Sequence, residues 1–278
     1  MTLAVSNIAW SYSERLDAYK LLKASGANGL EIAPGLLFAN APDPFNPSPN
    51  EIERALSEID DAGLTLVSMQ SLLYGVKGAA LFGTPAARQR IFDALKCAIA
   101  LAARLSIPNL VFGSPTQRNI PDHLSEVEAR THAGSFFRDL GDNAAKAQTV
   151  IAVEPNPMVY GTNFINTLRE AGEFVREVSH PNIGLNLDLG AMHVNGEFED
   201  TVQQIEEFAS IISHVHISEP DLAPAPAEPA RLNPVIRALR SVGYSKAISI
   251  EMRRGDRGLL DVRDGLRRLQ TATESPQS

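Results

Sequence analysis

The sequence has few of the residues that cross-link a small fold or anchor a protein in a membrane. Its 278 residues include one cysteine, Cys97, which excludes a disulfide or a cysteine-based zinc site within one chain. We expect Cys97 to be a small buried side chain on a helix. The first residues, MTLAVSNIAW, lack the basic start and long apolar stretch of a secretory signal, and no apolar run reaches transmembrane length. These absences predict a soluble, cytoplasmic protein.

Positive charge and aromatic side chains are also scarce. The chain has 25 Lys and Arg residues against 33 Asp and Glu residues, which gives a formal net charge of -8. We therefore expect neither a nucleic acid nor an anionic membrane as a partner. Aromatic residues make up 6% of the chain and hydrophobic residues 44%. The core must be mostly aliphatic, as in parallel sheets that are covered on both faces.

Short apolar runs and amphipathic stretches alternate along the whole chain. The apolar runs predict strands over 3–10, 29–34, 64–70, 109–115, 149–155, 183–190, 212–218 and 247–252. The amphipathic stretches predict helices over 14–25, 50–63, 86–105, 122–147, 163–178, 198–208, 230–243 and 259–270. Eight strand–helix units without a break in composition predict an α/β protein with a single (β/α)8 TIM barrel over residues 1–278. The tail from about residue 271 is expected to be frayed.

A dinucleotide-binding open sheet is the other common fold with this alternation. It usually carries a GxGxxG motif after its first strand, whereas this chain has SNIAWS there. The barrel is therefore favoured.

Four of the expected strands end in a side chain that can bind a cation. Glu154, Asp188 and Glu251 close the runs VIAVEP, IGLNLD and AISIEM, and His216 lies in HVHISEP. Active sites of such barrels lie at the C-terminal ends of the strands, so these four side chains are expected to meet. A structural alternative is that the carboxylates cap nearby helices or pair with arginines. That alternative is more typical of one strand-end carboxylate than of four together.

Three carboxylates and one imidazole form an oxygen-rich set of ligands. Such a set suits Mn²⁺, Mg²⁺ or Co²⁺ with open positions for substrate oxygens, and it suits a closed structural zinc site badly. An ion here would polarise a carbonyl and its neighbouring hydroxyl and so stabilise an enediolate. Glu154 and Glu251, on strands far apart around the barrel, would then move a proton on opposite faces of one carbon.

The motifs EPNPMVYGTNFINT, NLDLG, HVHISEP and SIEM, at these spacings, resemble the xylose isomerase-like TIM-barrel superfamily of sugar phosphate isomerases and epimerases. The resemblance covers nearly the whole chain and is greatest to the D-tagatose 3-epimerase group. It implies a metal ion bound by Glu154, Asp188, His216 and Glu251, with Mn²⁺ preferred and Mg²⁺, Co²⁺ or Zn²⁺ as alternatives. It also implies that Glu154 and Glu251 are the catalytic acid/base pair. The implied function is metal-dependent isomerisation or epimerisation of a sugar, sugar phosphate or related polyol ketone, and a homodimer is expected by analogy.

Three positions differ from the pattern that is usual in those epimerases. A histidine usually lies three residues after the aspartate ligand, where this chain has Ala191, with His193 two residues further on. An arginine usually lies six residues after the metal histidine, where this chain has Leu222. A second glutamate shortly after the first glutamate ligand is missing, and Tyr160 lies nearby. The ligands are kept while the residues that hold the sugar differ, so the sequence leaves the substrate open.

Further side chains end strands or follow the ligands closely, and we expect them to contact a carbohydrate-like substrate: Trp10, Glu31, Gln70, Asn156, Tyr160, His193, Glu219 and Arg253. For Trp10 a packing role stays open, and for Glu31 a structural ion pair. Arg253 is expected either to pair with Glu219 or to bind an anionic group.

Two polar residues, Asn186 and His214, precede two of the ligands by two positions. Side chains alternate along a strand, so both point inward at a deeper level than the ligands. We expect them to hydrogen-bond to the ligands rather than to contact substrate.

Three other functions are compatible with parts of this pattern. A dehydratase of an inosose-like keto-polyol would use the same metal and base. A catalytically silent sugar-binding barrel would have no need of both Glu154 and Glu251. A nucleic-acid enzyme of the endonuclease IV type would need a histidine-rich multi-zinc cluster and a basic face, which six histidines and a net charge of -8 disfavour.

Overall fold

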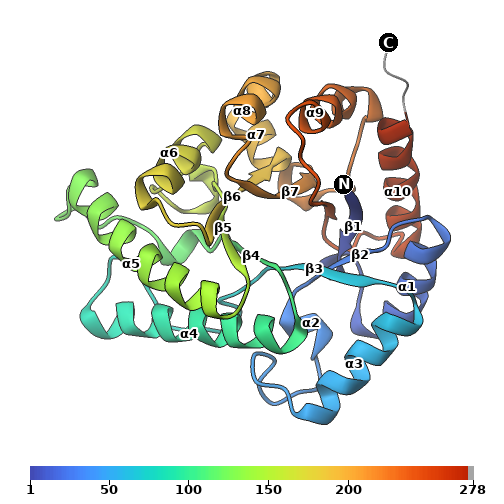
Figure 1. Cartoon of the computed structure of the whole chain (residues 1–278), viewed down its shortest axis with the longest axis horizontal. Helices are drawn as coiled ribbons and strands as arrows, with labels where there is room; N and C mark the ends of the chain where they lie inside the picture. Colours follow the sequence, from blue (N-terminus) through green and yellow to red (C-terminus); the bar gives the residue numbers. More distant parts are fainter. Residues whose placement is uncertain (275–278) are drawn as a thin grey trace.

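The centre of the molecule is a closed barrel of eight parallel strands, in which β1 pairs with both β2 and β8 (Figure 1). The computed structural model describes residues 1–274. The strands are β1 Thr2–Ser6, β2 Gly29–Ile32, β3 Thr65–Met69, β4 Asn109–Phe112, β5 Val150–Val153, β6 Ile183–Asp188, β7 Ile212–Ser218 and β8 Ala247–Glu251. The predicted (β/α)8 TIM barrel is confirmed.

Helices surround the barrel, and α10 closes the ring between α9 and α1 (Figure 1). The helices are α1 Arg15–Ala24, α2 Pro34–Leu37, α3 Pro49–Asp61, α4 Pro85–Leu105, α5 Glu126–Lys146, α6 Leu168–Val178, α7 Leu189–Asn195, α8 Thr201–Phe208, α9 Pro229–Ser241 and α10 Leu259–Glu274. Within residues 1–274, no helix is both long and apolar enough to cross a membrane.

Several helices begin where the sequence carries a capping box. Ser48, Ser125 and Thr167 each accept a hydrogen bond from the backbone three residues later, where a glutamate reaches back to the cap. This reciprocal pair satisfies two backbone N–H groups that a helix start leaves free. Thr167 therefore starts α6 at Leu168, five residues after the predicted start of that helix.

Seven of the eight predicted strands are shorter in the structure, and for the first and the sixth the cause is visible at the end of the strand. The first strand ends at Ser6, because Asn7 turns to bind the backbone of Ala33, accepting from its N–H at 2.7 Å and donating to its C=O at 3.3 Å. A 3-10 helix, Asn7–Ala9, follows instead of further strand. The sixth strand ends at Asp188, which caps the unpredicted helix α7.

Two further expectations need correction. Cys97 is exposed rather than buried, because α4 turns its buried stripe toward Leu95, Ala98 and Ile99 and leaves position 97 on the outer face. Residues 271–274, expected in a frayed tail, continue α10 to Glu274. Residues 275–278 of that predicted tail lie outside the described residues.

The interior of the barrel is polar near the strand ends, whereas the aromatic core lies outside the barrel. Glu31, Asn186, His214 and His216 are each at most 1% exposed and point into the barrel. A chain of edge-to-face contacts links five rings between the barrel and its outer helices: Phe82, Phe164, Phe174, Phe137 and Phe112. These five rings form one aromatic cluster that includes Phe112 of β4, Phe137 of α5 and Phe174 of α6.

Candidate functional site

The C-terminal ends of β5 to β8 bring four predicted ligands together. Strand pairing sets Asp188 beside His216, and Ser218 beside Glu251. Nδ1 of His216 lies 3.0 Å from Oε1 of Glu154, 3.3 Å from Oε2 of Glu251 and 3.6 Å from Oδ2 of Asp188. The four ligand atoms lie within 4.8 Å of one another.

Asp188 uses its two carboxylate oxygens differently. Oδ1 caps α7 by accepting from the N–H of Ala191 at 2.8 Å, and it accepts from the hydroxyl of Ser218 at 2.8 Å. The same hydroxyl accepts from the N–H of Gly190 at 2.8 Å. Oδ2 is the oxygen that faces His216. Helix capping and ligation are therefore both available to Asp188, one at each oxygen.

Glu154 is oriented by its neighbours on two sides. Asn186 donates to Oε1 of Glu154 at 2.8 Å, and it also contacts Nδ1 of His216 at 3.1 Å, as expected for a deeper polar residue. Oε2 lies against Gly113, the residue after β4, where a Cβ atom would collide with the carboxylate. Asn156 is 3.5 Å from the same oxygen. A glycine at 113 is thus needed for Glu154 to occupy this place.

The second nitrogen of His216 faces a buried carboxylate. Nε2 lies 3.1 and 3.2 Å from the two oxygens of Glu31, and His214 approaches Glu31 at 3.4 Å. Burial by itself would raise the pKa of Glu31, but the charges and hydrogen bonds of His216 and His214 outweigh it and hold the pKa well below its usual value. A carboxylate at one nitrogen of an imidazole orients the ring and directs the other nitrogen to a metal.

The remaining pKa shifts show how strongly the site attracts positive charge. Burial opposes a charge on His216, yet the carboxylates around it, with Glu251 and Glu31 foremost, raise its pKa well above the usual value. Burial raises the pKa of Glu251, and Glu154 and Asp188 act in the same direction while His216 opposes them. Carboxylates crowded in this way repel one another unless a cation lies among them.

The donor set fits a divalent cation. Glu154, Asp188 and Glu251 offer hard oxygen ligands, and His216 offers one nitrogen, all from the ends of rigid strands. A second group, Glu31 with His214 and His216, also lies within ligand distance. It is fully buried beneath the first group and shares His216, so we interpret it as support for that ring.

A cavity of about 330 Å³ opens above the four residues, three of which line it. Its wall also includes four of the predicted substrate contacts: Asn156, Tyr160, Glu219 and Arg253. Arg253 does not pair with Glu219, and its side chain forms no hydrogen bond or ion pair within residues 1–274. Glu219 instead accepts from the N–H of Ala227 at 2.7 Å. Ala191 and Leu222 add apolar wall.

The other four predicted substrate contacts lie outside this cavity. Glu31 lies beneath His216, so we now expect support of the ring instead of substrate contact. Gln70 is buried and donates to Ser6 at 2.8 Å. Trp10 is 3% exposed and belongs to the core.

His193 is the fourth of these residues, and its ring stacks on Phe198 at 3.9 Å between ring centres. It borders a separate space of about 60 Å³. His193 therefore does not replace the histidine that the related epimerases usually carry at the position of Ala191, which lines the cavity. For Trp10, the geometry favours the packing role that the sequence left open.

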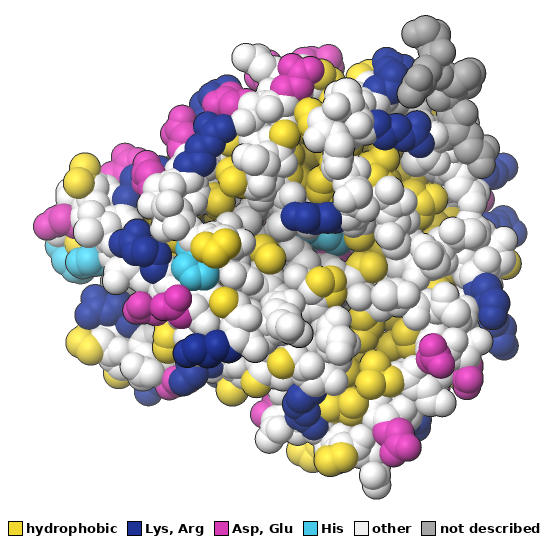
Figure 2. Space-filling view, viewed as in Figure 1, with side chains coloured by type: hydrophobic (Ala, Val, Ile, Leu, Met, Phe, Trp, Pro, Cys, Tyr) yellow, Lys and Arg dark blue, Asp and Glu magenta, His cyan; other side chains and the backbone are white. Residues whose placement is uncertain are grey.

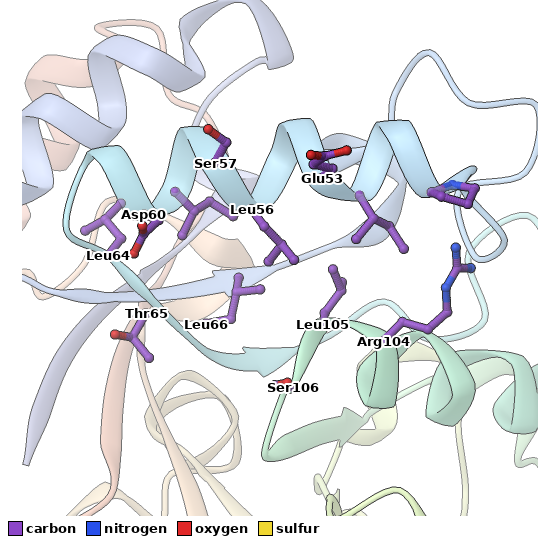
Figure 3. A pocket seen from close by; sticks show the side chains of 13 residues that line it. Glu53, Leu56, Ser57, Asp60, Leu64, Thr65, Leu66, Arg104, Leu105 and Ser106 are labelled. Atoms are coloured by element: carbon purple, nitrogen blue, oxygen red, sulfur yellow. The ribbon is translucent and has the colours of Figure 1, made fainter.

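A larger hollow of about 1010 Å³ lies on the outer wall between α3 and α4, where Leu56, Leu66 and Leu105 face one another (Figure 3). It shares no residue with the strand-end cavity and lacks converging ligands. On the face drawn in Figure 2, most basic and acidic side chains lie toward the rim, and hydrophobic side chains are exposed between them. We assign the candidate site to the smaller cavity because the ionisable groups converge there.

Three residues of the site were not found from the sequence. Ser218 lies two positions after His216 on the same strand face, a signal that alternation would have revealed. Gly113 and Arg118 follow β4, and no local pattern marks their approach to Glu154. Their roles follow from contacts between the ends of the neighbouring strands β4 and β5.

Comparison with known proteins agrees with this geometry. A family model described as "Xylose isomerase-like TIM barrel" matches residues 19–272. A ketose 3-epimerase of Arthrobacter globiformis is 30% identical over 92 residues, which span 33% of this chain and 31% of that protein. This chain therefore matches about a third of the length of that relative.

Solved structures share the fold at low sequence identity. The apo form of 3-keto-D-glucoside 4-epimerase from E. coli has a TM-score of 0.75 at 20% identity, covering 98% of this chain and 99% of that one. A D-psicose 3-epimerase in the presence of D-fructose has a TM-score of 0.78 at 16% identity, covering 98% of each chain. The IOLI protein with a bound zinc atom has a TM-score of 0.72 at 17% identity, covering 98% and 96%.

Proposed function

Because the chain belongs to the xylose isomerase-like TIM barrel family, we propose that it is a divalent-metal-dependent isomerase or epimerase of a sugar, sugar phosphate or related polyol ketone. The observation that carries this proposal is the convergence of Glu154, Asp188, His216 and Glu251 at the base of one cavity. The names of the similar proteins, several of them sugar epimerases, support it. Mn²⁺ is the ion we expect, because the ligands are mostly oxygens.

The ion, when bound by these four residues, would polarise a ketone and the neighbouring hydroxyl and stabilise an enediolate. Glu154 directs Oε1 and Glu251 directs Oε2 toward His216, where the ion would be held. Each glutamate keeps its other oxygen for proton transfer. We assign one glutamate to remove the proton from carbon and the other to return it, since they approach from strands on different sides of the cavity.

The cavity wall provides the contacts that would orient the substrate. Asn156 and Tyr160 bring amide and phenol groups, and Arg253 brings a guanidinium without a partner within the described residues. Such groups hydrogen-bond to hydroxyl oxygens and hold the reacting carbon in place. Burial excludes water from His216 at the base of the cavity, whereas Glu251 lines the cavity with 7% of its surface exposed.

The first test is the metal content of the protein purified without a chelator. We expect about one divalent ion per chain, and its loss in Asp188→Ala and in His216→Ala. A parent protein that binds no ion even after incubation with Mn²⁺, Co²⁺ or Mg²⁺ would refute the proposal.

The second test is turnover of ketoses and inososes with added Mn²⁺. Glu251→Gln should abolish turnover while the fold is kept, because an amide cannot accept the proton. Unchanged turnover in this variant would remove Glu251 from the mechanism. Products that have lost water would indicate the dehydratase rather than the epimerase.

A further inference from the structure

Among residues 1–274, Arg118 is the largest side chain that is fully buried, and it carries a charge. It follows β4, at the end of the 3-10 helix Pro115–Gln117. Burial lowers its pKa to about 10, with the charge of Glu154 acting in the opposite direction, so it stays protonated at neutral pH. It forms no ion pair within residues 1–274. Burying an unpaired charge costs several kcal/mol, so its position calls for a compensating role.

Its two terminal nitrogens bind backbone carbonyls at both ends of one loop. One terminal nitrogen donates to the C=O of Glu154 at 2.8 Å, and the other contacts the C=O of Ile165 at 3.4 Å. The loop between them, residues 155–166, carries Asn156 and Tyr160 to the cavity. Ile165 has a φ of 59°, which is rare for a β-branched residue, so its carbonyl must be held by its contacts. The N–H of Asn156 also donates to it, at 3.1 Å.

The outer part of the same loop is held by other residues. Asn163 accepts from the N–H of Ile120 at 2.7 Å and donates to its C=O at 3.0 Å. Asn119 accepts from the N–H of Asn163 at 3.0 Å and donates to the C=O of Gly161 at 2.8 Å. These bonds join the loops after β4 and β5 near the surface. Arg118 differs from Asn119 and Asn163 because it binds the backbone of Glu154, a predicted metal ligand, at the end of β5.

We propose that Arg118 is a positioning residue of the metal site, which fixes the backbone of Glu154 and closes the loop that carries Asn156. This proposal rests on the proposed function. A guanidinium suits the task because its planar fork reaches two carbonyls at once, whereas the single ammonium of lysine reaches one. The positive charge also offsets part of the negative charge of the buried carboxylates.

Arg118→Lys separates positioning from charge, because it keeps the charge and removes the fork. The measurements are the Mn²⁺ dissociation constant by titration calorimetry, and hydrogen exchange of residues 155–166 in metal-free protein. We expect about tenfold weaker Mn²⁺ binding than wild type, with faster exchange in the loop. Asn163→Ala is the matched control, expected to speed exchange in the same loop and to leave the dissociation constant within about twofold of wild type.

Two results would overturn the proposal. In the first, Arg118→Lys binds Mn²⁺ with wild-type affinity and Arg118→Met binds it more tightly. That pattern is expected if residue 118 acts only by repulsion between its positive charge and the ion. The other is Asn163→Ala weakening Mn²⁺ binding as much as Arg118→Lys. If Arg118→Lys does not fold, Arg118→Gln is judged by the same two measurements. Wild-type protein that binds no Mn²⁺ would refute the proposed function itself, whereas wild-type binding with unaffected variants refutes only the role of Arg118.

Discussion

Replacing Gly113 by alanine tests the placement of Glu154 by adding a single methyl group. The new Cβ atom would collide with Oε2 of Glu154, while its contact with Asn156, at 3.5 Å, would be ordinary. Non-bonded atoms settle about 3.5 Å apart, so the carboxylate must move by about 1 Å. Metal ligands tolerate displacements of only about 0.2 Å. We therefore expect the substitution to remove Glu154 from a metal ion without unfolding the protein.

The expected magnitudes differ for binding and for stability. Displacing Glu154 should weaken Mn²⁺ binding by about 10- to 100-fold, judged from the effect of disturbing groups around a metal ligand. That factor corresponds to about 1.4 to 2.7 kcal/mol. Gly113 is not among the residues with positive φ, so alanine fits its backbone, and the free energy of unfolding should change by less than about 1 kcal/mol. The flexible side chain of Glu154 can rotate away from the new methyl group, so the fold is kept while the metal site loses a ligand.

Gly134→Ala is the matched control for this experiment. Gly134 also lacks a positive φ, and an added Cβ would lie 3.6 Å from Arg138, an ordinary contact far along the chain from the ligands. Calorimetric titration with Mn²⁺ and urea unfolding of the metal-free proteins give the two quantities. If folded Gly113→Ala binds Mn²⁺ within about twofold of wild type, Glu154 is not a ligand at the position seen here. Equal weakening in both variants would mean that the effect is not local.

Two further experiments probe stability in the metal-free protein. Ser218→Ala removes the hydroxyl that donates to Asp188 and leaves the buried N–H of Gly190 without an acceptor, so it should lower the free energy of unfolding by about 1 to 3 kcal/mol. Ser249→Ala is the control: its buried hydroxyl has no partner within residues 1–274, so urea unfolding should show no measurable cost. Equal costs for the two variants would contradict this account. Hydrogen bonds from Arg254, then from Ser11, lower the pKa of Glu14 to about 2, so their stabilisation is present above about pH 4.5 and is lost as the pH falls toward 2. Glu14→Gln should therefore cost about 1 kcal/mol at pH 7, since the pair is partly exposed, and much less near pH 3, and a pH-independent cost would disprove the coupling.

Much of the fold was predictable because it is encoded locally. Short apolar runs identified the eight strands, and amphipathic stretches identified most of the long helices. The caps at Ser125 and Thr167 start α5 and α6 later than those stretches predicted. The ligands were predictable for the same reason, since Glu154, Asp188 and Glu251 each end an apolar run. Strand ends were less predictable: β1 stops at Ser6 because Asn7 binds a backbone 26 residues away.

The sequence by itself determined which residues reach the C-terminal end of the barrel and what kind of ion their chemistry suits. Only the tertiary structure decided which residues support them. Glu31 meets His216 across 185 positions of chain, and Arg118 meets Glu154 across 36. Periodicity specifies the face on which a side chain lies and nothing about its neighbours on other strands. Closure of the barrel sets those neighbours, and with them the buried charges around the site.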